Sequence, residues 1–536
     1  MFQSRTLAVI ALTATCAIGY GQQPSAAVLT HHNNALRTGL TAAESKLTWS
    51  NVSPTSFAKL FSYPVDGYIY AQPLYVPGVN IGGAKRNVVY VVTENNSIYA
   101  FDADRPAVGK LWQTNLNVGP SGTVVTPVPA ADVDCPDPSP IGITSTPVID
   151  IASATLYTVA KTKEVSTAGT NYFHRLHAIN LLTGQENPGS PVEIQASTPG
   201  TCGQTDGHGN VYLKAKIQLQ RAALLLADGV VYIAFAAHCD HDFYNGWLLG
   251  YDAKTLQQVS VFNATPDATD GYCKGGIWQT GSGPAWDGSN IYLITGNGDA
   301  YAKTPGTRGW GSSFVKLTPD PATKALSVTD SFTPYYFYTL NLYDFDLGGS
   351  GPLLVPSPNG TGPDLVIGAG KNSTIYVVDR DNMGGLGTTS DNVVQELHNS
   401  VGTYGAPTTT PVIFRNNVYF GGAGDRVKLF YVSNGRLSQQ PIAKGGRGFP
   451  GASAGMSLSS DPVGNNPILW AITSGTGGTL HAFNGQTLAE IYNSDMAGTR
   501  DTLGEGVKFN PPTIANGKVY AATSNALVVY GIPPAN

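Results

Sequence analysis

One stretch of the chain, residues 275–380, carries an aromatic, an amide, a carboxylate and a cation in an order that a redox site could use. The run GGIWQTGSG contains Trp278, ITGNGDAY contains Asn297, LYDFD contains Asp344 and AGKNSTIYVVDR contains Lys371. Amide and carboxylate oxygens are ligands that suit calcium. A carboxylate can also act as a general base, and a fixed ammonium can stabilise developing negative charge. These residue types therefore indicate redox chemistry, provided that the fold brings them together.

The chain around these residues is built from one repeated unit, which must position them. Runs such as VVYVVTENNSIYAFDADRPAVGKLWQ and VVYIAFAAHCDHDFYNGWLLGYDAKTLQQV show period-2 alternation bounded by Gly, Asn and Asp. This pattern predicts short strands joined by tight turns. Such units begin near residues 67, 141, 224, 275, 344, 402, 448 and 508. The repeat predicts an all-β fold, a β-propeller of eight four-stranded blades.

The two ends of the repeat array predict how the ring closes. The last unit, GKVYAATSNALVVYGI, is short, and FAKLFSYPVD at 57–66 is a strand-like run before the first unit. We expect this N-terminal strand to complete the last blade, which leaves no open edge in the ring. The separations of 19, 47 and 27 positions between Trp278, Asn297, Asp344 and Lys371 then place them in three consecutive blades that can converge on the ring axis.

Composition agrees with this fold class and argues against one class of partner. Only 12% of the residues are charged, whereas the chain has 63 Gly, 36 Pro and 27 Tyr, which suits many strands and disfavours long helices. The net charge is −5, from 31 basic and 36 acidic residues with no block of like charge. Nucleic acid is therefore not an expected partner.

The N-terminus predicts export. The run MFQSRTLAVIALTATCAIGYGQQ has one Arg, an apolar stretch and small residues ending near Gly21, which is typical of a signal peptide over residues 1–21. The mature chain, 22–536, is then a single propeller domain that is secreted or periplasmic. We expect Cys16 to be removed with the signal, with lipid attachment as the alternative. No later stretch approaches 18 apolar residues, so no membrane span is expected.

Four cysteines remain after cleavage: Cys135, Cys202, Cys239 and Cys273. An even number in an exported chain predicts two disulfides, but three pairings are possible and the sequence does not choose among them. Cys135 and Cys202 lie in two long inserts, 117–140 and 195–216, where a disulfide would be mainly structural.

The repeat YAFDA…G…LWQ resembles the blade signature of the pyrroloquinoline quinone (PQQ) repeat proteins over nearly the entire mature chain. Residues 275–380 are similar to the matching part of the eight-bladed quinoprotein alcohol dehydrogenases, which show a Trp, a Gly-Asn, an acidic-aromatic-Asp element and a basic residue. The resemblance implies an oxidoreductase that oxidises an alcohol or sugar hydroxyl with PQQ. It also implies an external electron acceptor, because the chain has no C-x-x-C-H haem motif.

The resemblance assigns a role to each residue. Trp278 would be the flat floor on which the planar cofactor stacks. Asn297 and Asp344 would be calcium ligands, and Asp344 would also be the general base that removes the hydroxyl proton. Lys371 would stabilise negative charge on the reduced quinone. Asp346 lies two residues further along what we expect to be the same strand face, so it could point inward in place of Asp344.

The chain departs from the family at a further calcium ligand. Where the family has a Glu, alignment on GWLLGYDA places His241, and histidine is a poor calcium ligand. Asp240 or Asp242 could substitute after a one-residue shift, although such a shift turns the side chain to the other face of a strand. His238, Cys239, His241 and Asp242 also lie close enough in the sequence to suggest a zinc cluster, but their spacing matches no closed zinc site.

Two other functions remain open. PQQ-like repeats also build non-catalytic propellers, so the chain could bind a glycan or a protein partner through its central face. A polysaccharide lyase using His and Tyr as acid and base is a third possibility, although the abundance of Tyr does not argue for it. The sequence has no G-x-S-x-G or H-E-x-x-H motif, which argues against the familiar hydrolases.

Overall fold

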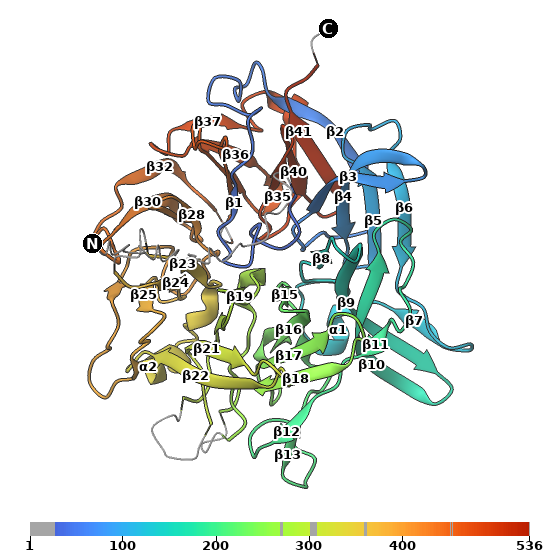
Figure 1. Cartoon of the computed structure of the whole chain (residues 1–536), viewed down its shortest axis with the longest axis vertical. Helices are drawn as coiled ribbons and strands as arrows, with labels where there is room; N and C mark the ends of the chain where they lie inside the picture. The colour runs from blue at the N-terminus through green and yellow to red at the C-terminus, as the bar shows by residue number, and fades with distance from the viewer. Residues whose placement is uncertain are drawn as a thin grey trace, which may run out of the picture.

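Eight small antiparallel sheets stand in a ring around a central axis in the computed structural model (Figure 1). The structure describes residues 27–267, 272–300, 308–357, 362–450, 452 and 454–534. The expected signal peptide at 1–21 lies outside the described residues. The fold confirms the prediction of an eight-bladed β-propeller.

The first four blades follow the chain, each running outward from the axis. Their strands are β3 (Leu74–Ile81), β4 (Ala84–Val92), β5 (Ser97–Asp102) and β6 (Lys110–Asn115) in blade 1; β8 (Val148–Asp150), β9 (Thr155–Ser166), β10 (Gly169–Asn180) and β11 (Val192–Glu193) in blade 2; β15 (Leu225–Ala227), β16 (Val230–Ala237), β17 (Trp247–Asp252) and β18 (Gln258–Asn263) in blade 3; and β19 (Ala285–Trp286), β20 (Ile291–Ile294), β21 (Phe314–Pro319) and β22 (Leu326–Thr333) in blade 4.

The remaining blades repeat this order. Their strands are β23 (Leu353–Val355), β24 (Leu365–Ala369), β25 (Ile375–Asp379) and β27 (Gln395–Leu397) in blade 5; β28 (Val412–Phe414), β29 (Asn417–Phe420), β30 (Arg426–Ser433) and β32 (Ala443–Gly448) in blade 6; β33 (Gly455–Ser459), β34 (Ile468–Ile472), β36 (Leu480–Asn484) and β37 (Glu490–Asn493) in blade 7; and β39 (Thr513–Ala515), β40 (Lys518–Ala522), β41 (Ala526–Gly531) and β2 (Ala58–Pro64) in blade 8.

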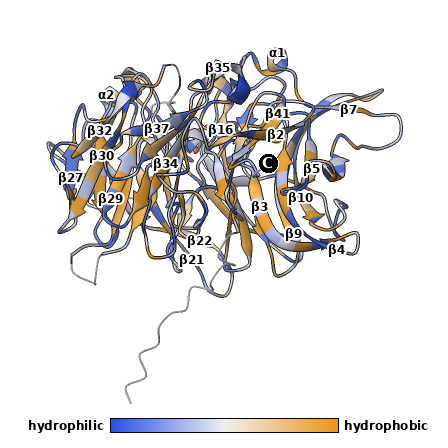
Figure 2. Ribbon diagram, turned by 90° about the horizontal axis from the view of Figure 1, so that it is seen from above, coloured by the Kyte–Doolittle hydropathy of each residue, from blue (hydrophilic) through white to orange (hydrophobic). Residues whose placement is uncertain are grey.

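Short elements decorate these sheets. They are the strands β1 (Leu40–Thr41), β7 (Val124–Thr126), β12 (Ser197–Pro199), β13 (Asn210–Tyr212), β14 (Gln218–Leu219), β26 (Gly385–Leu386), β31 (Arg436–Leu437), β35 (Gly475–Gly478) and β38 (Gly504–Gly506), the helices α1 (Ala130–Val133) and α2 (Phe337–Leu342), and the 3₁₀ turns η1 (His238–Asp240), η2 (Gln279–Gly281), η3 (Leu347–Gly349) and η5 (Gly498–Asp501). Both α1 and α2 lie on one face of the ring (Figure 2). Among the described residues, no helix has the length and apolar character needed to cross a bilayer.

Several strands are buried on both faces, which differs from the alternation expected from the sequence. All eight residues of β16 and all five of β34 are buried, because each blade is sandwiched between two neighbours. A strand covered on both sides becomes a continuous apolar run, as VVYIAFAA and ILWAI are. The hydrophobic core is therefore a series of layers between blades, visible as the orange strands of Figure 2.

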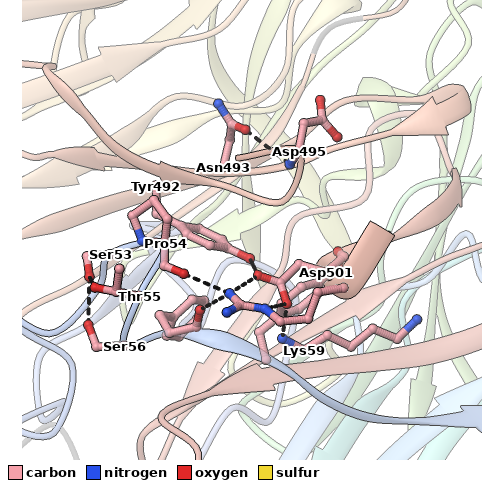
Figure 3. A network of polar contacts seen from close by, with 12 residues as sticks. Ser53, Pro54, Thr55, Ser56, Lys59, Tyr492, Asn493, Asp495 and Asp501 are labelled. Atoms are coloured by element: carbon pink, nitrogen blue, oxygen red, sulfur yellow. Dashed lines mark hydrogen bonds and ion pairs between the residues drawn. The ribbon is translucent and has the colours of Figure 1, made fainter. Parts of the chain in front are cut away.

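The ring closes as predicted, with β2 as the outer strand of blade 8. It pairs antiparallel with β41, Ser62 opposite Val528. Asp501 reinforces the junction, because its carboxylate accepts hydrogen bonds from the backbone N of Lys59 (3.0 Å) and from Oη of Tyr492 (2.9 Å) (Figure 3). Segments from the two ends of the chain thus share one polar network.

The segment before β2 forms a second closure that the sequence did not predict. Residues 28–41, here called the N-terminal belt, run around the axis inside the innermost strands (Figure 1). Their backbone or side chains bond in turn to Tyr75, Ile149, Leu224, Trp286, Leu354, Ile413, Leu458 and Ile514, one residue from each blade or from the segment that leads into it. A single short segment therefore contacts all eight blades.

Candidate functional site

The structure brings the four predicted residues to one place on the face that carries α2. Trp278 lies at the start of η2, in the connection from blade 3 to blade 4, and Asn297 follows β20 of blade 4. Asp344 lies just after α2, in the connection between blades 4 and 5. Lys371 lies in the turn between β24 and β25 of blade 5. The four residues therefore come from two blades and their connections, and not from three blades as expected.

Direct contacts join these side chains. Nδ2 of Asn297 donates a hydrogen bond to Oδ1 of Asp344 (2.9 Å). Nζ of Lys371 lies 3.2 Å from the other oxygen of the same carboxylate. The Lys371 ammonium also lies 5.6 Å from the centre of the Trp278 ring. An amide, a carboxylate, an ammonium and an indole thus share one small volume.

Asp346 completes this cluster. Its Oδ2 lies 2.6 Å from Nζ of Lys371, and its Oδ1 accepts a hydrogen bond from the backbone N of Asn297 (2.8 Å). The two carboxylates differ in environment, because the side chain of Asp346 is 8% exposed and that of Asp344 is 67% exposed. Lys371 bridges a buried and an exposed carboxylate.

The local backbone differs from the strand that we expected at LYDFD. Asp344 adopts a left-handed conformation (φ 58°) in the turn that ends α2, and Asp346 precedes η3. Two residues in such a turn do not follow the period of a strand, so both carboxylates reach Lys371. The sequence named both residues, but only the turn geometry shows that they act together.

The charge balance favours a protonated Lys371. Burial alone would lower the pKa of Lys371, but the charges and hydrogen bonds of Asp346 and Asp344 outweigh burial and raise that pKa above its ordinary value. The ammonium therefore stays charged throughout the physiological range. It also offsets much of the cost of burying the Asp346 carboxylate.

The turn after Trp278 has an unusual backbone. Gln279, Thr280 and Gly281 all have left-handed φ values, of 46°, 49° and 88°. A β-branched residue such as Thr280 rarely adopts this conformation. Backbone strain of this kind persists only where the surroundings hold it, and it is common at binding sites.

Arg221 is a second cation at this turn, and the sequence analysis missed it. It is 5% exposed, and its guanidinium packs so closely on Gly281 that a Cβ there would lie 2.3 Å from Nη1. The guanidinium also lies 5.4 Å from the centre of the Tyr70 ring. Its Nη2 has no hydrogen-bond partner among the described residues. Only its burial among distant segments marks it, so no local motif could have found it.

The predicted metal site can be tested against these contacts. Asn297 is 2% exposed, and its Oδ1 has no hydrogen-bond partner within the described part of the chain. Asp344 and Asp346 add carboxylate oxygens beside it, and these are ligands that calcium accepts. Calcium takes about six to eight oxygens, so these residues fit one side of a metal ion that a bound ligand would complete.

Residues 240–242, where the quinoprotein family has a further calcium ligand, lie near this cluster. His241 is exposed, and Asp242 pairs with Lys214 (3.1 Å) at the surface. Asp240 accepts a hydrogen bond from Tyr244. Burial raises the pKa of Asp346, the charge of Lys371 opposes this rise, and the charge of Asp240 adds to it. Asp240 is therefore the acidic residue of this segment that interacts electrostatically with the site.

The two disulfides link the long inserts at 117–140 and 195–216 to segments beside the candidate site. Cys135 pairs with Cys239, and Cys202 pairs with Cys273. Cys239 precedes Asp240, and Cys273 lies five residues before Trp278 in the sequence. The zinc hypothesis is wrong, because Cys239 is in a disulfide and His238 Nε2 lies 2.8 Å from Nζ of Lys161.

Comparison with known proteins identifies the fold. No protein-family model and no curated protein matches the chain. Among solved structures, the quinohemoprotein alcohol dehydrogenase of Pseudomonas putida HK5 is similar over 96% of this chain and 81% of its own, with TM-score 0.59 and 13% identity.

Two further solved structures give the same result. The quinohemoprotein alcohol dehydrogenase of Comamonas testosteroni matches 95% of this chain and 82% of its own, with TM-score 0.55 and 12% identity. A europium-containing methanol dehydrogenase matches 95% of this chain and 98% of its own, with TM-score 0.57 and 12% identity. At this identity the likeness shows a shared fold, and function must be argued from the site.

Proposed function

We propose that this protein is an exported, quinoprotein-like oxidoreductase that oxidises an alcohol or sugar hydroxyl with PQQ. The observation that carries the proposal is the meeting of Trp278, Asn297, Asp344 and Lys371 at one point of a fold shared with quinoprotein alcohol dehydrogenases. The two disulfides support export, because disulfides persist in oxidising compartments.

The cofactor would lie against Trp278, whose indole offers a flat apolar surface. Two cations, Lys371 and Arg221, flank the turn that begins at Trp278. PQQ is a planar polycarboxylate, so an aromatic surface with cations close to it suits both its shape and its charge. When bound beside a hard cation, PQQ would supply an electron-poor quinone that accepts hydride.

Side chains of the protein accept the proton of the substrate hydroxyl and orient the group that accepts it. Asp344 is exposed enough to meet a substrate hydroxyl and accepts its proton. The hydrogen bond from Asn297 and the ion pair with Lys371 fix the direction of the Asp344 carboxylate. Asp346 holds Lys371 from the buried side. Asn297, Asp344 and Asp346 would bind the metal ion, for which calcium is the first candidate and europium the second, given the europium-containing neighbour.

Titration of the mature protein with PQQ tests this proposal. Tryptophan fluorescence is followed without metal, with calcium and with europium. Tight binding is expected, and Trp278→Ala and Lys371→Ala should each weaken it at least tenfold because they remove the floor and a cation. Trp49→Phe and Lys444→Ala, which alter residues away from the cluster, serve as matched controls. Circular dichroism of each variant shows whether it is folded.

The outcomes separate the open functions. Saturable, mutation-sensitive binding would justify a dye-linked screen of alcohols and sugars, in which Asp344→Asn should lose nearly all turnover while still binding PQQ. Absence of saturable PQQ binding with either metal would refute the proposal. A non-catalytic propeller that binds a glycan or a protein partner would then be the better account.

A further inference from the structure

Three aromatic side chains form a cluster beside Asp344, here called the aromatic rim: Tyr343, Phe345 and Tyr404. The rings of Tyr343 and Phe345 are nearly parallel, with centres 5.7 Å apart. The ring of Tyr404 meets Phe345 edge-on at 4.4 Å. Phe345 is 8% exposed and forms the base, whereas Tyr343 and Tyr404 are 61% and 60% exposed. Two tyrosine rings are therefore held by a buried ring but remain open to solvent.

The rim is attached directly to the candidate site. Asp344 lies in the chain between Tyr343 and Phe345. The Tyr404 loop is fixed to the other side of the cluster, because the backbone N of Gly405 donates a hydrogen bond to the carbonyl oxygen of Lys371 (2.8 Å). The aromatic rim therefore borders the exposed Asp344 carboxylate, and a molecule whose hydroxyl meets this carboxylate can also contact one or both tyrosines.

The openness of the rim indicates what kind of ligand it suits. A purely apolar ligand, such as an aromatic alcohol, is usually enclosed on most of its surface. Tyrosines about 60% exposed cannot enclose a ligand, but each offers one flat face with a polar group at its edge. A sugar ring has the matching chemistry, since it presents a C–H face and a border of hydroxyl groups.

A cavity of about 370 Å³ has Tyr68, Tyr70, Ser139, Glu505 and Lys508 among its lining residues. Phe509 follows Lys508 in the chain, and its ring centre lies 6.4 Å from that of Trp278, so the cavity lies near Trp278. Hydroxyl and charged groups in such a cavity suit further sugar hydroxyls.

We infer that the substrate of this site is a saccharide, with one sugar ring stacked on Tyr343 or Tyr404 while a hydroxyl of the same or the next unit meets Asp344. The inference rests on the proposed function in that it treats Asp344 as the group that meets the substrate. The stacking itself belongs to the protein, so it does not require the cofactor for detection.

The test measures saccharide binding before any turnover. Isothermal titration of the mature protein uses maltotriose, cellotriose and glucose as probes, with benzyl alcohol and methanol for comparison, first without and then with PQQ and calcium. At least one trisaccharide should bind, and it should bind more tightly than glucose or either simple alcohol. Tyr343→Ala and Tyr404→Ala should each weaken that binding about tenfold.

Two sets of variants make the result specific. Tyr343→Phe and Tyr404→Phe keep the ring and should retain most of the affinity. Tyr431→Ala removes a tyrosine of similar exposure (45%) on β30 and should change nothing. A thermal melt of each variant shows that loss of binding is not loss of folding.

The outcomes distinguish this inference from the proposed function. Rim-dependent trisaccharide binding without any PQQ binding would support the saccharide platform and refute the oxidoreductase. PQQ binding together with rim-dependent binding of benzyl alcohol alone would support the oxidoreductase and overturn the saccharide. Failure of all the saccharides, or saccharide binding that ignores both Ala variants, would also overturn the inference.

Discussion

Lys371 shows how single residues set the properties of the site. The Lys371 ammonium forms ion pairs with the buried Asp346 and the exposed Asp344 carboxylates, and it also lies over the Trp278 ring. Because burial raises the pKa of Asp346, the charge of this carboxylate depends on Lys371, and loss of Lys371 would favour the protonated acid. The charge of the Asp344 carboxylate depends less on Lys371, since solvent screens an exposed carboxylate. The exposed member of the pair is therefore the one that is free to meet a substrate.

Glu94 is a buried titratable group whose environment has a measurable consequence. It lies between blades 1 and 2, where Oε2 accepts hydrogen bonds from the backbone N of Gly142 (2.7 Å) and from Oγ1 of Thr144 (3.0 Å). Burial raises the pKa of Glu94 to about 8, against the opposing effects of these hydrogen bonds and of Arg221, while Asp137 adds to the rise. The folded protein therefore holds a proton that the unfolded chain releases near its ordinary pKa of 4.5.

We predict that Glu94→Gln removes part of the pH dependence of stability. Because the folded pKa is raised, the stabilising contribution is complete below about pH 4.5 and is lost as the pH rises to about 8. The wild-type free energy of unfolding should fall by up to about 1.4 kcal/mol per pH unit from this group. Guanidinium unfolding at pH 5, 6.5 and 8 measures the difference. The exposed Glu193→Gln should keep the wild-type slope, and an unchanged slope in Glu94→Gln would contradict the prediction.

At the scale of elements, the N-terminal belt is held by one side chain above all. Arg37 is 0% exposed and donates hydrogen bonds to Oγ1 of Thr30 and to the carbonyl oxygens of His31, Leu224 and Pro284, at 2.8 to 3.3 Å. The last two acceptors lie on the segments that lead into blades 3 and 4. A guanidinium can serve several carbonyls at once because its donors are fixed in a planar fork.

We predict that Arg37→Met lowers the free energy of unfolding by about 3 kcal/mol or more. The substitution keeps much of the volume but leaves several buried carbonyl oxygens without a donor, and each such loss costs about 1–3 kcal/mol. Chemical denaturation measures the change. Arg436→Met, at an exposed position, should stay within about 0.5 kcal/mol of the wild type. Equal stability of the two variants would show that the belt is not anchored by Arg37.

At the scale of the whole molecule, the ring is closed by the pairing that joins the N-terminal segment to the last blade. The pairing of β2 with β41 is the only strand pairing in the described sheets that joins the N-terminal segment to blade 8. Arg500 adds polar contacts across it, with hydrogen bonds to the carbonyl oxygens of Pro54 (2.9 Å) and Phe57 (3.0 Å) and an ion pair with Asp501. A closed ring of this kind protects all its strand edges only while that junction holds.

We predict that Asp501→Asn lowers the free energy of unfolding by about 2 kcal/mol at pH 7, the scale of a charge-assisted hydrogen bond. Burial alone would raise the pKa of Asp501. Hydrogen bonds from Arg500, Lys59 and Tyr492 outweigh burial and lower this pKa below its ordinary 3.8. Its contribution is therefore present above pH 3.8 and is lost as the pH falls through the lower, folded pKa. Unfolding at pH 7 and pH 3 should show the difference shrinking in acid.

The neighbouring Asp495 provides the control for this prediction (Figure 3). Asp495 is exposed, so Asp495→Asn should change stability by less than about 0.5 kcal/mol at both pH values. An Asp501→Asn variant with wild-type stability at pH 7 would show that β-strand pairing alone closes the ring.

The sequence by itself determined the elements and their order. Strand-turn repeats are local patterns, so they predicted the eight blades, and the strand-like run at 57–66 predicted the partner of β41. Trp278, Asn297, Asp344 and Lys371 lie together as the hypothesis of convergence required, although they come from two blades and their connections and not from three blades. The role of each residue in the proposed chemistry remains a prediction.

Only the tertiary structure decided how distant segments meet. The pairing of Cys135 with Cys239 joins residues 104 positions apart, and Arg221 reaches Gly281 from the preceding blade. Asp346 and Asp344 both contact Lys371 because the chain forms a turn at these residues and not the strand that we expected. The belt contacts six blades through backbone groups, which carry no sequence signature, and reaches Leu224 and Ile514 through the side chains of Arg37 and Thr41. Such contacts depend on how blades pack against one another, and local residue patterns do not encode that packing.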